Sequence, residues 1–112
     1  MLVILESPYA GDIKRNLAYA RRAVRDSVDL GESPIASHLL YTQPGILRDD
    51  VPAERDLGKA LGYLWHDCAD MMVVYHDFGI TPGMRDAMFA WRKTGKPVAY
   101  RIIGQEENDA AL

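Results

Sequence analysis

Short apolar runs alternate with segments of helical spacing along this chain, and that alternation restricts its fold more than any other feature. Residues 2–5, 71–75 and 97–103 are apolar runs typical of strands covered on both faces. Residues 34–41 are predicted as a further strand. Since strand–helix–strand units join parallel strands by right-handed crossovers, the sequence predicts an α/β fold of three-layer, Rossmann-like (flavodoxin-like) type. We expect a four-stranded parallel sheet with helices on both faces.

Three helices are expected between these strands. Asp12 is a suitable cap for the first helix, and Gly31 ends it. Asp50 is the expected cap of the second helix, with Pro52 in its first turn. The third helix begins near Pro82. Helical spacing predicts the buried positions Ile13, Leu17, Ala20, Val24 and Val28 in the first helix, Leu57, Ala60, Leu61, Leu64 and Cys68 in the second, and Met84, Ala87, Met88 and Trp91 in the third.

Length and composition narrow the class of protein further. The chain has 112 residues, which fits one domain over residues 1–104 followed by a tail over 105–112. A net charge of -3 without a Lys/Arg run disfavours nucleic-acid binding. The longest apolar run, residues 71–75, is too short to span a membrane. One cysteine suits a reducing cytoplasm. A short chain with 48% apolar residues also predicts a homo-oligomer, with contacts through the second helix near Tyr63 and Trp65.

Ligands of parallel sheets bind beyond the carboxyl ends of the strands, which directs attention to residues 6–12, 38–50 and 76–84. The first of these loops has neither a dinucleotide fingerprint nor a Walker motif. Its helix N-terminus still offers amide groups, and Ser7, Tyr9 and Arg15 add side-chain donors. The alternative is an ordinary turn in which Gly11 provides the geometry.

The third loop places two glycines and a proline around Thr81. Thr81 is a suitable helix cap, and the amides of Gly83 and Met84 could receive a phosphate or a sugar hydroxyl. Asp77, at the tip of a buried strand, is a candidate functional acid. Asp86 is a second candidate, although a helix-end charge is an equally simple explanation.

The histidines provide weaker signals. His38 lies three residues before Tyr41, which fits a ligand site or a structural histidine equally well. The histidines at 38, 66 and 76 lack metal-ligand spacing, so no metal is predicted, and no cofactor is predicted either.

The order of several short motifs resembles a known family. The first strand ends in Ser-Pro-Tyr at residues 7–9, Cys-Ala-Asp at 68–70 precedes the strand at 71–75, and Asp77-x-Gly79-x-x-x-Gly83-Met84 is followed by a helix and by Gly-Lys-Pro-Val at 95–98. This pattern resembles the nucleoside 2-deoxyribosyltransferase-like superfamily, and in particular its small bacterial and phage-encoded members.

The resemblance implies chemistry at an N-glycosidic bond: a carboxylate attacks the anomeric carbon while other acids and a tyrosine position the sugar. Tyr9 matches the family's first-loop residue, and Asp77 matches its acid after the third strand. Arg85 stands where the family has a nucleophilic glutamate, so Asp86 is the available acid. The loop analysis and the resemblance together make Glu6, Tyr9, Asp77 and Asp86 the candidate catalytic residues. The candidate ligand-binding residues are Ser7, Gly11, Arg15, His38, Tyr41, Asp56, Gly79, Thr81, Gly83, Met84 and Arg85.

Three functions therefore stay open at the level of sequence. The first is hydrolysis or transfer at the N-glycosidic bond of a nucleoside or nucleotide, with Arg15 and Arg85 near a 5′-phosphate. The second is a catalytically inactive protein that senses or sequesters a nucleotide, favoured by Arg85 at the nucleophile position. The third is an interaction module.

Overall fold

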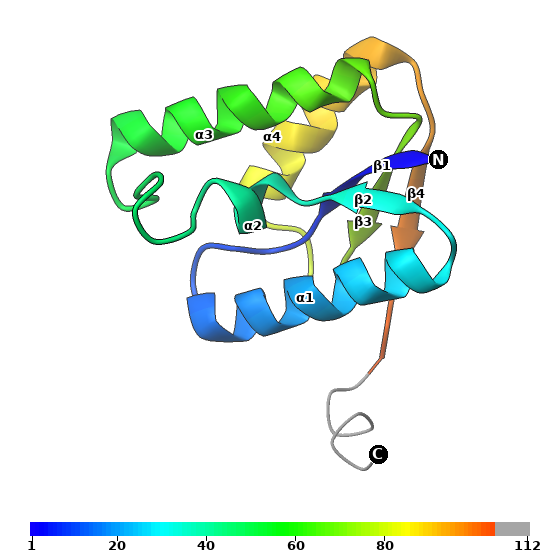
Figure 1. Cartoon of the computed structure of the whole chain (residues 1–112), viewed down its shortest axis with the longest axis horizontal. Coiled ribbons are helices and arrows are strands. Elements are labelled where there is room, and N and C mark those ends of the chain that lie inside the picture. The colour runs from blue at the N-terminus through cyan, green and yellow to red at the C-terminus, as the bar shows by residue number, and fades with distance from the viewer. Residues whose placement is uncertain (105–112) are drawn as a thin grey trace.

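The computed structural model describes residues 1–104; the predicted tail at 105–112 lies outside the described residues. The strands are β1 (Leu2–Glu6), β2 (Ser33–Ile35), β3 (Met71–Tyr75) and β4 (Val98–Arg101). The α-helices are α1 (Ile13–Asp29), α2 (Ser37–Leu40), α3 (Pro52–Leu64) and α4 (Pro82–Trp91), and the short 3-10 helices are η1 (Trp65–Asp67) and η2 (Arg92–Thr94) (Figure 1).

The four strands form one parallel sheet in the order β2-β1-β3-β4, which confirms the predicted α/β fold. Side chains of successive strand residues point to opposite faces. Leu5 and Val73 pack with Tyr19 of α1 on one face. Ile4 and Met72 pack with Trp91 of α4 on the other. The sheet is thus covered by α1 on one face and by α3 and α4 on the other (Figure 1).

The prediction of the second strand was wrong in part. Residues 34–41 do not form one strand: β2 ends at Ile35 and residues 37–40 form α2. The Tyr41 amide donates to the Ser37 carbonyl, which closes this helical turn. A Cβ atom at Gly62 of α3 would lie 2.8 Å from the Ser37 hydroxyl oxygen. Close packing of α2 on a glycine of α3 therefore competes successfully with the apolar pattern of this segment.

The prediction of the buried face of α3 was also wrong. Leu57 and Leu64, predicted inside, are 49% and 69% exposed, and Cys68 is exposed as well. Gly62 and His66 are buried in their place. The inner face of α3 borders a cavity, so small and polar residues occupy it and the leucines lie outside. Asp50 is not the cap of this helix either: the N-cap is Val51, and Asp50 pairs with Arg48 at 2.8 Å.

The other two helices match their predictions more closely. Asp12 caps α1 through a hydrogen bond from the Arg15 amide, as expected. The buried face of α1 is rotated toward Tyr19 and Ala23, which leaves Ile13 and Val28 exposed. Met84, Ala87 and Trp91 of α4 are buried as predicted. No helix among residues 1–104 has the length and apolar content needed to cross a membrane.

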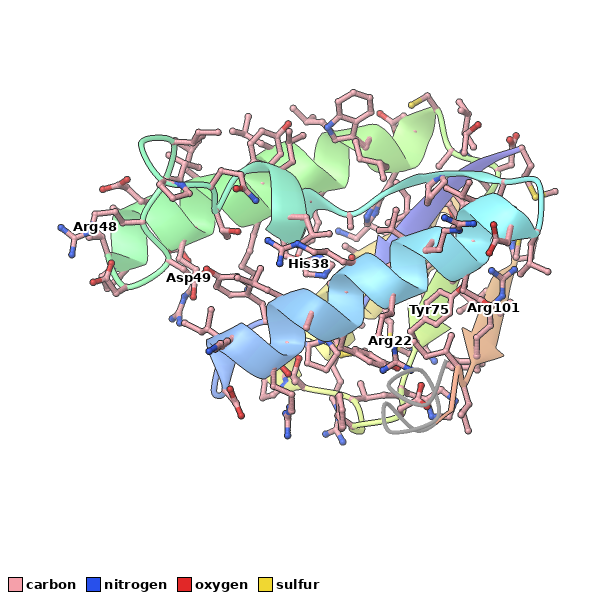
Figure 2. All side chains as sticks on the ribbon, turned by 60° about the horizontal axis from the view of Figure 1, so that its bottom comes forward. Arg22, His38, Arg48, Asp49, Tyr75 and Arg101 are labelled. Atoms are coloured by element: carbon pink, nitrogen blue, oxygen red, sulfur yellow. The ribbon has the colours of Figure 1, made fainter. Side chains whose placement is uncertain are left out.

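A polar network lies between α1 and the end of β4. The Arg101 guanidinium donates to both carboxylate oxygens of Glu32 at 2.6 and 2.8 Å and to the Tyr75 hydroxyl at 3.1 Å. Tyr75 in turn donates to Asp26 of α1 at 2.7 Å. Figure 2 shows Tyr75 and Arg101 side by side near the C-terminal end of α1. These charged groups satisfy one another and fasten α1 to the sheet.

Candidate functional site

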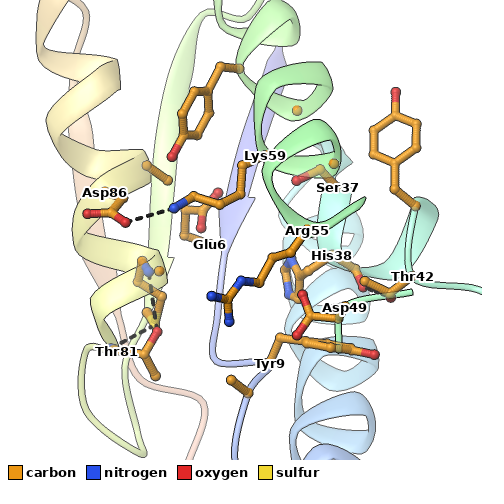
Figure 3. Close-up of a pocket in the computed structure, with 18 of the residues that line it drawn as sticks. Glu6, Tyr9, Ser37, His38, Thr42, Asp49, Arg55, Lys59, Thr81 and Asp86 are labelled. Atoms are coloured by element: carbon orange, nitrogen blue, oxygen red, sulfur yellow. Dashed lines mark hydrogen bonds and ion pairs between the residues drawn. The ribbon is translucent and has the colours of Figure 1, made fainter. Parts of the chain in front are cut away.

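A cavity of about 530 Å³ lies at the carboxyl edge of the sheet, between α3 and α4 (Figure 3). It brings together three of the predicted catalytic residues: Glu6, Tyr9 and Asp86. Eight predicted ligand-binding residues also line it, namely Ser7, Gly11, His38, Tyr41, Asp56, Thr81, Gly83 and Met84. The cavity is within the size range of small-molecule sites.

Glu6 is the last residue of β1 and lies on the side of the sheet that faces α3 and α4. Alternate residues of a strand point to the same face, and Ile4, two residues before Glu6, packs against residues of α4. Within residues 1–104 its carboxyl group has no hydrogen-bond partner, and burial raises its pKa to about 8. Near neutral pH Glu6 is therefore a protonated acid that can donate a proton to a ligand.

Asp86 reaches the cavity from the first half of α4 and pairs with Lys59 of α3. The Lys59 ammonium donates to the Asp86 carboxylate at 2.8 Å, and this hydrogen bond raises the pKa of Lys59. The ion pair connects the two helical walls of the cavity (Figure 3). Sequence reasoning missed Lys59 because it assigned the wrong face of α3 to the interior.

Ser7 and His38 form a hydrogen-bonded pair in the cavity wall. The Ser7 hydroxyl oxygen lies 2.7 Å from Nε2 of His38, and burial lowers the pKa of His38 to about 4. The imidazole is therefore neutral at physiological pH. This contact joins the end of β1 to α2 and fixes the hydroxyl that follows Glu6.

Arg55 is a second residue that the sequence did not indicate. It lies one helical turn before Lys59 on α3, and its side chain extends into the cavity (Figure 3). Within residues 1–104 the Arg55 guanidinium has no ion pair or hydrogen bond. A cation without a partner in a cavity wall is available to a ligand.

Asp77, the remaining predicted catalytic acid, lies outside the cavity. Its carboxylate accepts hydrogen bonds from the Tyr19 hydroxyl and from the amides of Ile103 at 3.1 Å and Gly104 at 2.9 Å. Asp77 follows Val73 and Tyr75 at intervals of two, and both of these side chains face α1. The alternation along β3 thus directs Asp77 away from the cavity and into a structural contact.

Arg15, Gly79 and Arg85 are also predicted ligand residues that do not line the cavity. The Arg15 guanidinium lies over the Phe78 ring, 4.2 Å from its centroid, and bonds to Asn16. Arg85 is exposed. The two arginines expected near a phosphate therefore face other surroundings.

The N-terminus of α4 has less to offer a ligand than its sequence suggests. Thr81 is the cap, as predicted, and its hydroxyl accepts from the Met84 amide at 3.2 Å. Pro82 has no amide hydrogen. Gly83 therefore provides the amide of this turn that has no partner within residues 1–104.

No metal centre is formed by the described part of the chain. Among residues 1–104, no group of three or more His, Cys, Asp or Glu side chains is arranged to hold a metal ion. The chemistry available in the cavity is that of carboxyl, hydroxyl, imidazole and cationic side chains.

The parallel sheet and its helices define an α/β domain with a cavity at the carboxyl edge of the sheet, where ligands of such sheets commonly bind. A family model, described as a domain of unknown function (DUF7768), matches residues 1–101, and the chain belongs to this family. No curated protein matches the chain. No solved structure matches it either.

Proposed function

We propose that this protein binds a nucleoside or nucleoside monophosphate in the cavity and hydrolyses or transfers at its N-glycosidic bond. The observation that carries the proposal is a pair of carboxyl groups in different electrostatic surroundings. Glu6 is uncharged near neutral pH, whereas Asp86 is paired with the Lys59 ammonium. Pairs of acids whose environments separate their protonation states are the basis of acid–base assignments in glycosidic cleavage.

The proposed reaction assigns opposite tasks to these acids. An Asp86 oxygen bonds to the anomeric carbon as the bond from that carbon to the base nitrogen breaks, and Glu6 gives its proton to the departing base. Glu6, now a carboxylate, then takes a proton from water as the water oxygen attacks the anomeric carbon and releases Asp86. In the transfer reaction a second base replaces water. The ligand must displace Lys59 from Asp86 for the first step.

The cavity wall also suits a flat base. Tyr9, Tyr41, Tyr63 and Trp65 line it, and the Trp65 indole donates to the Tyr41 hydroxyl at 3.1 Å, which fixes both rings. Aromatic side chains stack on nucleobases with about 1–3 kcal/mol per base. The motif order described above supports the same ligand class independently of this geometry.

A catalytically inactive nucleotide-binding protein is the second candidate. Arg85 stands where the nucleoside 2-deoxyribosyltransferase-like superfamily has its nucleophilic glutamate, and the Arg85 side chain does not line the cavity. The Lys59 ion pair also reduces the availability of Asp86 for attack. A sensing or sequestering protein needs the cavity but not the nucleophile.

Incubation with a panel of nucleosides and nucleoside monophosphates, followed by chromatography for free base, separates these candidates. Free base supports the enzyme. A thermal shift without free base supports the inactive binding protein. If neither base release nor a thermal shift occurs, the ligand class is wrong.

We also propose that the chain forms a homo-oligomer in the cytoplasm and does not bind nucleic acid. Leu57 and Leu64, both exposed on α3, form with the half-buried Leu61 an apolar stripe that a second copy can cover. The lone cysteine suits a reducing compartment.

A further inference from the structure

The charge of the cavity bears on a choice that the proposed function leaves open, between a nucleoside and its 5′-monophosphate. Four carboxylates line the cavity: Asp49, Glu54, Asp56 and Asp86. Two cations, Arg55 and Lys59, oppose them. Glu6 is uncharged because burial raises its pKa to about 8, and burial lowers the pKa values of His38 and His66 so that both are neutral. The lining therefore has two net negative charges.

Neither cation is isolated from these carboxylates. Lys59 already pairs with Asp86 at 2.8 Å. Arg55 has no ion pair within residues 1–104, but it lines the same cavity as Asp49, Glu54 and Asp56. A phosphomonoester adds about 1.5 to 2 negative charges near pH 7, so it would meet repulsion from the carboxylates around its best cationic partner.

Backbone amides do not compensate for this charge. The Asp12 carboxylate occupies the N-terminus of α1, where it accepts from the Arg15 amide. At the N-terminus of α4, Pro82 has no amide hydrogen and the Met84 amide is bonded to Thr81. The Gly83 amide is left without a partner within residues 1–104, and one amide does not offset two net negative charges.

From these charges we infer that the ligand of the cavity is an unphosphorylated nucleoside, with 5′-phosphates disfavoured by the acidic lining. This inference rests on the proposed function and specifies its substrate class. Sugar hydroxyls are neutral donors, and the carboxylates along the cavity are acceptors for them. The same carboxylates that repel a phosphate thus provide the contacts that a free nucleoside needs.

The test compares each nucleoside with its own 5′-monophosphate on the intact protein. The dissociation constant is measured by calorimetry, or the Michaelis constant where base is released, at about 50 mM and about 500 mM salt. We expect the best nucleoside to bind at least tenfold more tightly than its monophosphate at low salt. Because this preference is electrostatic, the ratio between the two dissociation constants should decrease at high salt.

Variants identify the groups responsible. Asp49→Asn combined with Asp56→Asn should reduce the discrimination severalfold by tightening monophosphate binding. Asp29→Asn is the matched control, because Asp29 lies on α1 outside the cavity and pairs with Arg25. Circular dichroism checks that each variant is folded, and the salt dependence of the unaltered protein tests the same cause without substitution.

The outcomes separate the inference from the proposed function. Monophosphates that bind as tightly as nucleosides, or a preference insensitive to both salt and the paired substitutions, overturn the inference and leave the proposed function standing. Failure of all nucleosides and monophosphates to bind overturns both.

Discussion

The two faces of the sheet use polar residues in opposite ways. On the α1 face, Asp77 and Arg101 are saturated by protein partners and connect α1 to β4 and the segment after it. On the α3/α4 face, Glu6 and Arg55 line a cavity and have no hydrogen-bond partner within residues 1–104. Both faces receive acids from strand ends, so a place at the carboxyl edge is insufficient for a ligand role. The face of the sheet toward which a residue at a strand end points decides whether that residue joins a structural network or lines the cavity.

The largest expected effect comes from the cavity acids. If the protein is an enzyme, Glu6→Gln and Asp86→Asn should each lower turnover about a hundredfold or more, because each removes an oriented catalytic group. Base release, measured by chromatography, checks this. Full activity in Asp86→Asn would exclude its role as nucleophile while leaving the fold and the cavity unchanged.

Asp77→Asn should show the reverse pattern. The Asn side chain places an NH2 group where one carboxylate oxygen accepted a hydrogen bond from the amide of Ile103 or Gly104. One amide then loses its acceptor, which should lower the unfolding free energy by about 1–3 kcal/mol. Ligand affinity and turnover should stay at the level of the unaltered protein, because Asp77 does not line the cavity. Urea denaturation and the base-release assay measure the two quantities. A loss of turnover at unchanged stability would contradict the assignment of Asp77 to the structural face.

Glu6 also predicts how stability depends on pH. Its pKa is raised from 4.5 to about 8 in the folded protein, so between these values the folded state keeps a proton that the unfolded state has lost. Stability should then fall as pH rises through this window, by up to about 1.4 kcal/mol per pH unit from this group. Glu6→Gln removes the titration, so the difference in unfolding free energy between the two proteins should change with pH. Parallel stability curves from pH 5 to 8 would refute the buried, protonated state of Glu6.

The smallest expected effect on stability concerns the outer face of α3. Leu64→Lys changes a side chain that is 69% exposed, so the unfolding free energy should change by no more than about 0.5 kcal/mol. Self-association should weaken clearly, because a charge would enter the apolar stripe. Light scattering over a range of protein concentrations measures this, with Lys93→Glu, exposed on η2, as a control for a surface charge change. An unaltered protein that is already monomeric at high micromolar concentration would count against the stripe as an interface.

The sequence predicted β1, β3 and β4 because their short apolar runs alternate with segments of helical spacing, whereas the less regular segment 34–41 was wrongly predicted as one strand. The same patterns predicted Glu6, Tyr9 and Asp86 at one site, since strand ends and helix starts meet at one edge. The apolar spacing on α3 gave the wrong buried face, because spacing alone does not distinguish an apolar face that packs on the sheet from one that lies exposed. Arg55 and Lys59 were missed for this reason. Asp77 was wrongly predicted to line the cavity. The sequence does not show which face of the sheet α1 covers, and so does not show to which face the alternation along β3 directs Asp77.

The short edge strand β2 limits how copies of this protein can aggregate. Its Ser33 amide donates to the carbonyl of Met1, the residue before β1, so the next residue, Pro34, directs its backbone nitrogen toward the open side of the sheet. Proline has no hydrogen there to offer an incoming strand, and three residues are too few to template a long pairing. The missing N–H and the short length of β2 therefore disfavour strand-by-strand pairing of further copies at this edge of the sheet.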